Sequence, residues 1–160
     1  MIIILMGVSG AGKTVVGQLL AEELGWSFYD ADDFHPRSNI EKMTRREALS
    51  DEDRRPWLEA LRALITQTLA SGDNAILACS ALKSEYREFL LIDPQVLLVY
   101  LKGSFSLIQQ RLDDRRGHFM TAALLQSQLD ALEEPSDAIV VDVSASPQEL
   151  VRAIRAKLGV

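Results

Sequence analysis

The feature that most constrains the fold is a glycine-rich segment, Gly7 to Thr14, which reads Gly-Val-Ser-Gly-Ala-Gly-Lys-Thr. It follows the apolar run Ile2–Met6 and leads into a segment from Lys13 with the period of a helix. A loop of this composition between a strand and a helix matches G-x-x-x-x-G-K-[ST], which wraps the phosphates of a nucleotide. The sequence therefore predicts an α/β fold with this loop at the carboxyl end of its first strand.

The residue types in this loop suit a triphosphate. Glycines let several backbone N–H groups turn inward, and the following helix adds the positive end of its dipole. We expect the Lys13 ammonium to reach the β- and γ-phosphates and the Thr14 hydroxyl to be a ligand of Mg²⁺. The alternative is a chance glycine turn with an exposed lysine. The predicted nucleotide contacts are Gly7, Ser9, Gly10, Ala11, Gly12, Lys13, Thr14 and Val15.

Apolar runs alternate with helix-period segments along the rest of the chain, which predicts one α/β domain over residues 1–160. We expect a five-stranded parallel sheet with helices on both faces, a three-layer α/β/α arrangement. The predicted strands are Ile2–Met6, Trp26–Tyr29, Ala75–Cys79, Val96–Leu101 and Ala138–Val141. The predicted helices are Lys13–Leu24, Arg55–Leu69 (with Pro56 in its first turn), Lys83–Leu91, Phe105–Arg115, Ala122–Leu132 and Pro147–Leu158.

The composition limits which kinds of partner the protein binds and which cellular compartment we expect for it. The net charge of −6 argues against nucleic acid, whose binders usually carry a basic face. Cys79 is the only cysteine, so no internal disulfide can form, which fits a reducing compartment. The apolar start at Met1–Met6 predicts a buried strand rather than a signal peptide, and no apolar run approaches the ~20 residues of a membrane span. We expect a cytoplasmic protein with no membrane partner.

Three carboxylates occupy four positions at the end of the second predicted strand, in Asp30, Asp32 and Asp33. Like charges this close call for a cation or hydrogen-bond donors to stabilise them. The third strand ends in Ala78-Cys79-Ser80 and lacks the aspartate that commonly supports Mg²⁺ in such folds. We therefore assign Asp30 to the Mg²⁺ site and Asp32 to the base that accepts the proton of an attacking hydroxyl. The alternative is an acidic turn that caps the next helix.

These segments, together with several downstream ones, resemble the gluconate kinase (gluconokinase) family, a branch of the small-molecule P-loop kinases related to shikimate kinases. The resemblance covers nearly the whole chain in one register. The segments that carry it are Met6–Thr14, Asp30–Pro36, Asn39, Lys42-Met43, Asp51–Leu58, Cys79–Lys83, Tyr86-Arg87, Arg115–Met120, Leu124-Leu125, Ser127-Gln128 and Leu132–Pro135.

The resemblance implies a P-loop nucleoside triphosphate hydrolase fold with a mobile lid. It also implies a carbohydrate kinase that uses ATP and Mg²⁺ to convert D-gluconate into 6-phosphogluconate, and a homodimer. The chain departs from the family at residues 46–49, where it reads Arg-Glu-Ala-Leu and the family usually has Gly-x-Pro-Leu. Because both turn formers are lost, we expect the preceding helix to run longer, near the side where the acceptor binds.

The acceptor pocket implied by this resemblance needs a cationic fork and several polar groups. Arg54 suits the gluconate carboxylate because a guanidinium binds carboxylate bidentately. Lys83 and Arg87 share a helix face and are predicted substrate contacts, the alternative being an ordinary exposed face. For Arg54 the alternative is a solvated charged turn paired with Asp51 and Asp53. The remaining candidates for contact with the substrate are Asp32, Ser80 and His35, the last of which either lines the pocket or closes the turn.

A lid is expected at about residues 111–125. Arg111 and Arg115 stand on one helix face before Gly117, which could act as a hinge. The family resemblance implies that a lid arginine offsets charge on the transferring phosphoryl group, and we assign Arg115 to this catalytic role and Arg111 to the nucleotide. The alternative for both is pairing with nearby surface acids. His118 and Phe119 either close over the site or pack in the core.

Other readings stay open at this stage. The loop Ser144–Pro147 either holds the adenine ring or starts the last helix. The acceptor could instead be shikimate or a nucleoside monophosphate. A nucleotide-dependent binding module without an acceptor is a rival of another class, although no Asn-Lys-x-Asp guanine-reading motif is present.

Overall fold

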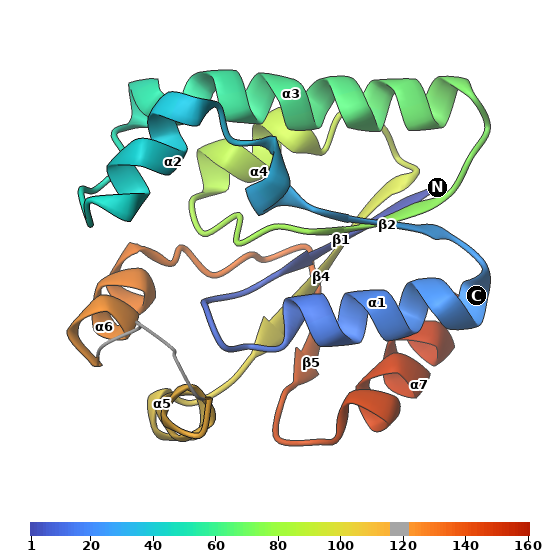
Figure 1. The fold of residues 1–160 in the computed structure, drawn as a ribbon. Coiled ribbons are helices and arrows are strands. Elements are labelled where there is room, and N and C mark those ends of the chain that lie inside the picture. Colours follow the sequence, from blue (N-terminus) through green and yellow to red (C-terminus); the bar gives the residue numbers. More distant parts are fainter. Residues whose placement is uncertain (116–121) are drawn as a thin grey trace.

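The computed structural model describes residues 1–115 and 122–160. Its centre is a sheet of five parallel strands in the order β2-β3-β1-β4-β5 (Figure 1). The strands are β1 (Ile2–Met6), β2 (Ser27–Asp30), β3 (Ala75–Ala78), β4 (Val96–Lys102) and β5 (Ile139–Asp142). All five predicted strands are therefore confirmed, with ends that move by at most one residue.

Helices cover both faces of this sheet and confirm the three-layer arrangement (Figure 1). The helices are α1 (Lys13–Leu24), η1 (Ala31–Phe34, a 3₁₀ turn), α2 (Arg37–Thr44), α3 (Asp51–Ala70), α4 (Ser84–Leu90), α5 (Phe105–Asp113), α6 (Ala122–Ala131) and α7 (Pro147–Leu158). α3 and α4 pack on one face, and α1 and α7 on the other. Among the described residues, no helix has the length and apolar character needed to cross a membrane.

The central strand explains why two cores form. Successive side chains of a strand point to opposite faces. Ile2, Ile4 and Met6 therefore pack under α3 and α4, whereas Ile3 and Leu5 pack under α1 and α7. All five are at most 1% exposed, as expected for a parallel strand covered on both faces. The loop that follows β1 is thus anchored at the middle of the sheet.

α3 begins four residues earlier than the sequence predicted. Ser50 and Asp53 form a capping box, in which each side chain accepts a hydrogen bond from the other's backbone N–H. This cap satisfies the first free N–H groups and lets the helix start at Asp51. The prediction that Pro56 lies in the first turn was therefore wrong, because Pro56 lies inside the helix.

The segment after β2 contains two helical elements, η1 and α2, for which the sequence reading gave no bounds. The expected extension of a helix through residues 46–49 was also wrong. α2 ends at Thr44, and Arg46 takes a left-handed conformation with φ of 60°. The N–H of Arg46 donates to the Met43 carbonyl at 3.0 Å, and the N–H of Glu47 donates to the Lys42 carbonyl at 2.9 Å. A Schellman-type turn thus forms without the usual glycine.

Candidate active site

The loop after β1 folds into a nest at the start of α1. Gly10 and Gly12 have φ of 82° and 98°, a region that side chains rarely adopt. A Cβ atom on Gly10 would also lie 2.8 Å from the Leu112 side chain of α5, so that position leaves no space for one. The nest and the amino end of α1 together suit bound phosphate. Predicted contacts Ser9, Gly10, Gly12, Lys13 and Thr14 line this cavity of about 300 Å³.

Lys13 is held against the loop it follows. Its Nζ donates to the carbonyl oxygens of Gly7 at 2.9 Å and Val8 at 3.0 Å. Burial lowers the pKa of Lys13, while the negative charge of Asp32 is the largest opposing influence. The ammonium is therefore fixed at the wall of the cavity, where an anion would compensate for its burial.

The two predicted Mg²⁺ residues lie together. The Thr14 hydroxyl donates to Asp30 Oδ2 at 3.3 Å, and Asp30 Oδ1 accepts from the Asp32 N–H at 3.0 Å. A hydroxyl and a carboxylate oxygen suit the hard Mg²⁺ ion, which usually takes one or two protein oxygens beside phosphate and water. Asp30 also caps η1, so the alternative capping role operates at the same residue.

Asp32 faces the same cavity. It does so from a 3₁₀ turn formed by residues 31–34, at the end of the second strand. Withdrawal of the Asp32 carboxyl from bulk water raises its pKa, and neighbouring Asp30 raises it further. Lys13 and His35 oppose the shift. A carboxylate with a raised pKa is better suited to accept a proton.

A second cavity of about 400 Å³ adjoins the first and shares Asp32, Ser80 and Gln128 with it. The predicted substrate contacts Asp32, His35, Arg54, Ser80 and Lys83 all line it. Met43 and Leu49, on either side of the Arg46 turn, also reach this cavity, so the departing segment contributes to its wall. Asp32 thus lies where a phosphate-binding space meets a polar acceptor space.

Two cations of this second cavity are already balanced by Asp51. Lys83 Nζ lies 3.1 Å from Asp51 Oδ1, and an Arg54 nitrogen lies 4.0 Å from the same oxygen. Tyr86 donates its hydroxyl proton to Asp51 and accepts from Arg54 at 3.3 Å. The alternative of a charged turn paired with Asp51 is therefore present in the structure. The same arrangement holds Arg54 and Lys83 at the edge of the cavity.

Arg87 does not face the acceptor cavity, contrary to the prediction. Its side chain is buried, with the residue only 6% exposed. The guanidinium donates to the carbonyl oxygens of Ala81 at 2.8 Å, Leu82 at 3.0 Å and Glu133 at 2.6 Å. Helix-face spacing grouped Arg87 with Lys83, but Lys83 is the N-cap of α4 and Arg87 points into the protein. Arg87 thus joins α4 to the segment after α6.

The predicted arginines of the lid lie beside the phosphate cavity. Arg115 lines both that cavity and a third space of about 420 Å³, which Arg111 and Val15 also line. The loop Ser144–Pro147 forms another wall of this third space, and Ser146 also caps α7. Both readings of that loop are therefore compatible with the structure. Gly117, His118 and Phe119 lie outside the described residues.

Gln128 is a site residue that the sequence reading did not single out. It projects from α6, and its Oε1 accepts a hydrogen bond from the Ser9 N–H at 2.7 Å. It lines both the phosphate cavity and the acceptor cavity. The available signals were the segment Ser127-Gln128, which carries part of the family resemblance, and its place three positions after Leu125, which is buried in the structure.

Comparisons with known proteins point in one direction. The shikimate kinase family matches residues 9–158. A probable gluconokinase of Xenopus tropicalis is 44% identical over 99% of this chain and 93% of its own length. The thermoresistant gluconokinase of Escherichia coli (strain K12) is 43% identical over 89% of this chain and 84% of its own. The crystal structure of a gluconokinase from Sinorhizobium meliloti 1021 superposes with a TM-score of 0.86 at 42% identity, covering 98% of this chain and 90% of that one.

Proposed function

The chain belongs to the gluconokinase family of shikimate-kinase-type P-loop kinases, and from that membership we propose that it phosphorylates D-gluconate with ATP. The products are 6-phosphogluconate and ADP. The observation that supports this most directly is the position of Asp32, shared by a cavity built for phosphate and a cavity with cationic and polar walls.

In the proposed reaction the chain mainly positions charges. The nest and Lys13 hold the triphosphate, and the acceptor hydroxyl donates its proton to Asp32 as it attacks the γ-phosphorus. Arg54 and Lys83, which line the acceptor cavity, hold the gluconate carboxylate. Arg115, which follows the end of α5, offsets charge on the transferring group, a contribution worth roughly 10³–10⁵ in rate in related systems.

Mg²⁺ is the proposed metal, and Thr14 and Asp30 are the residues that would hold it. When bound, the ion neutralises charge on the β- and γ-phosphates. The 3.3 Å contact between Thr14 Oγ1 and Asp30 Oδ2 keeps both oxygens on the same side of the loop. Removal of Mg²⁺ with a chelator should abolish turnover, and addition of Mg²⁺ should restore it.

An assay of ADP release tests the proposal. Purified protein is mixed with MgATP and, in separate reactions, with gluconate, shikimate or a nucleoside monophosphate. We expect release only with gluconate, and 6-phosphogluconate as the product by mass spectrometry. Release with another acceptor would contradict the substrate, and release without any acceptor would favour a simple ATPase. ATP binding without acceptor-dependent release would favour a non-catalytic nucleotide-binding module.

We also propose that the protein is a homodimer in the cytoplasm. The dimer is an expectation from the resemblance, and analytical ultracentrifugation tests it. The compartment is supported by Cys79 being the only cysteine, since a chain that forms no internal disulfide fits a reducing compartment. Cell fractionation with a specific antibody tests the location.

A further inference from the structure

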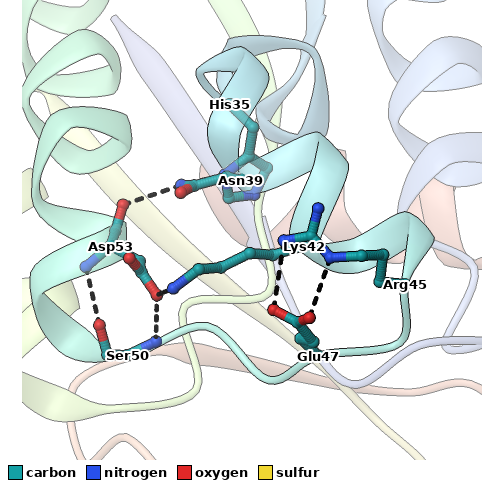
Figure 2. A network of polar contacts seen from close by, with 7 residues as sticks. All are labelled: His35, Asn39, Lys42, Arg45, Glu47, Ser50 and Asp53. Atoms are coloured by element: carbon teal, nitrogen blue, oxygen red, sulfur yellow. Dashed lines mark hydrogen bonds and ion pairs between the residues drawn. The ribbon is translucent and has the colours of Figure 1, made fainter.

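The buried side-chain amide of Asn39, beside the acceptor cavity, contacts the ring of His35 and indicates which ring nitrogen carries a proton. Asn39 on α2 is 2% exposed, and its Nδ2 makes two contacts (Figure 2). One is to the Asp53 carbonyl oxygen at 2.8 Å, and the other is to His35 Nδ1 at 3.2 Å. A carbonyl oxygen only accepts, so the atom facing it must be the amide nitrogen, which fixes the orientation of the Asn39 side chain.

The second proton of that amide then faces His35 Nδ1. An imidazole nitrogen that accepts a hydrogen bond carries no proton, so the ring proton sits on Nε2. We propose that Asn39 is a positioning residue that holds His35 as the neutral Nε2–H tautomer, and that this N–H donates a hydrogen bond to an oxygen of the acceptor. The inference rests on the proposed kinase function and adds a residue and a proton position to it.

The His35 ring is fixed in a second way. It stacks on the Trp57 indole, with ring centroids 4.6 Å apart and planes 9° from parallel. Trp57 is itself held, because its Nε1–H donates to the Ala31 carbonyl at 2.6 Å. The ring therefore has a set plane from Trp57 and a set proton from Asn39. Both His35 and Trp57 line the acceptor cavity.

The surrounding charges agree with a neutral ring. Burial lowers the pKa of His35, and Arg54 lowers it further. Asp32 opposes this shift. Asp32 and Arg54 are the charged groups that face His35 within the described part of the chain, from η1 and α3 respectively.

The arrangement gives the cavity complementary hydrogen-bonding groups. Asp32 accepts a proton or hydrogen bond, whereas the His35 Nε2–H can only donate one in this tautomer. A polyhydroxylated acid satisfies both, since its hydroxyls donate and its hydroxyl and carboxylate oxygens accept. An ammonium group placed against His35 would leave two donors facing each other. We expect the site to reject acceptors with an amine at that position.

Asn39 is held in place where α2 meets the start of α3. Lys42 forms an ion pair with Asp53 Oδ2 at 2.9 Å, and the same oxygen accepts from the Ser50 N–H at 2.9 Å (Figure 2). The Asp53 carbonyl that orients Asn39 therefore belongs to the capped first turn of α3. The tautomer of His35 is thus set by the packing of one helix against the start of another.

The direct test is long-range ¹H–¹⁵N NMR of the imidazole rings in the full-length wild-type protein. The chain has two histidines, and the signals lost in His35→Phe identify His35. We expect the Nε2–H pattern at neutral pH and protonation only below the ordinary pKa of 6.5. An Nδ1–H pattern, or a ring that is charged at neutral pH, would overturn the inference. This measurement needs no activity, so it is independent of the proposed function.

Variants test the role of Asn39. In Asn39→Asp the new carboxylate accepts instead of donating, so the His35 proton should move to Nδ1 or the ring should become charged. Asn39→Leu removes both donors and should leave a mixture of tautomers. If both folded variants kept the wild-type pattern, Asn39 would not set the tautomer. The wild-type spectrum still decides the matter if either variant fails to fold.

Steady-state kinetics test whether the His35 Nε2–H donates a hydrogen bond to the acceptor. His35→Phe keeps the stack on Trp57 and removes the N–H, so KM for gluconate should rise roughly 10- to 100-fold while KM for ATP stays unchanged. His35→Gln places an amide N–H near the lost position and should recover part of the loss. An unchanged KM for gluconate in His35→Phe would overturn the proposed hydrogen bond, whereas wild-type protein without gluconate turnover would instead contradict the proposed function.

Discussion

Asp32 lines both the phosphate cavity and the acceptor cavity, and the groups around it affect how readily its carboxylate accepts a proton. Asn replaces the carboxylate with an amide of nearly the same shape that cannot take the proton. We expect Asp32→Asn to lower kcat by roughly 10²- to 10⁴-fold, the usual contribution of a general base, with little change in KM for ATP. Steady-state kinetics with gluconate varied at saturating ATP measure this. An unchanged kcat would transfer the role to Asp33 or to solvent.

The same carboxyl predicts a pH dependence. Its pKa is raised from 3.8, chiefly by withdrawal from bulk water and then by Asp30. The base works only when deprotonated, so activity should be full above that raised pKa and fall as the pH drops through it. The acid limb of the kcat/KM profile, which reports groups of the free enzyme, should therefore lie above pH 3.8 in the wild type. The residual activity of Asp32→Asn should lack this limb.

At the residue scale, the sequence predicted what local chemistry determines. Lys13 and Thr14 follow from the motif, and Asp30 with Asp32 follows from charge clustering at a strand end. The roles of Arg87 and Gln128 could not be predicted in this way, because they depend on segments far away in the chain. Arg87 reaches the carbonyl of Glu133, and Gln128 reaches the N–H of Ser9. Single-sequence periodicity carries no information about such partners.

At the scale of elements, the turn after α2 stores backbone strain. Arg46 has φ of 60°, which costs a side-chain-bearing residue roughly 1–2 kcal/mol relative to glycine. Replacing Arg46 by glycine would remove this cost, but part of the stabilisation is offset because glycine makes the unfolded chain more flexible. We expect Arg46→Gly to stabilise the protein by about 0.5–1 kcal/mol, measured by urea unfolding. Arg46→Ala is the matched control and should gain nothing, so an equal gain there would mean that the side chain, not the backbone, is responsible.

Arg87 links two elements, and its substitution separates a structural role from a binding role. Met keeps a long apolar stem but removes the donor to three carbonyl oxygens, of which only that of Leu82 has a further donor among residues 1–115 and 122–160, the Glu133 N–H at 2.9 Å. We expect Arg87→Met to destabilise the protein by about 2–4 kcal/mol in chemical unfolding. KM for gluconate should not change when the assay is run well below the unfolding midpoint. A large rise in that KM, with stability unaffected, would instead support the original prediction of a substrate contact.

The elements themselves were predicted where periodicity is strong and missed where the chain turns quickly. α1 and α7 have the predicted ends, because the glycine loop starts one and Ser146-Pro147 starts the other. The start of α3 was misplaced because the Ser50 cap lies upstream of the apolar stripe. η1 and α2 are short, and the apolar stripe that reveals a helix is weak in α2, where only Asn39 is buried.

At the scale of the whole molecule, the fold brings together loops from different strands. The phosphate nest follows β1, the acidic turn follows β2 and Ser80 follows β3, and these three strands are neighbours in the sheet. The sequence predicts five parallel strands but not their order, since every run of apolar residues looks alike. Once β3 lies between β1 and β2, carboxyl ends of parallel strands meet at one edge, and the site follows.

Ligand binding at that edge should stabilise the entire domain. A ligand that binds only the folded state at a hundredfold excess over its Kd adds ~2.7 kcal/mol, roughly 5–10 °C in Tm for a domain of this size. We expect a non-hydrolysable ATP analogue with Mg²⁺ to produce such a shift in differential scanning calorimetry. Lys13→Ala should lose most of the shift, because the nest would lack its cation. Each protein is compared with and without the analogue, which removes any effect of the substitution on stability itself. A full shift in Lys13→Ala would place the triphosphate elsewhere on the molecule.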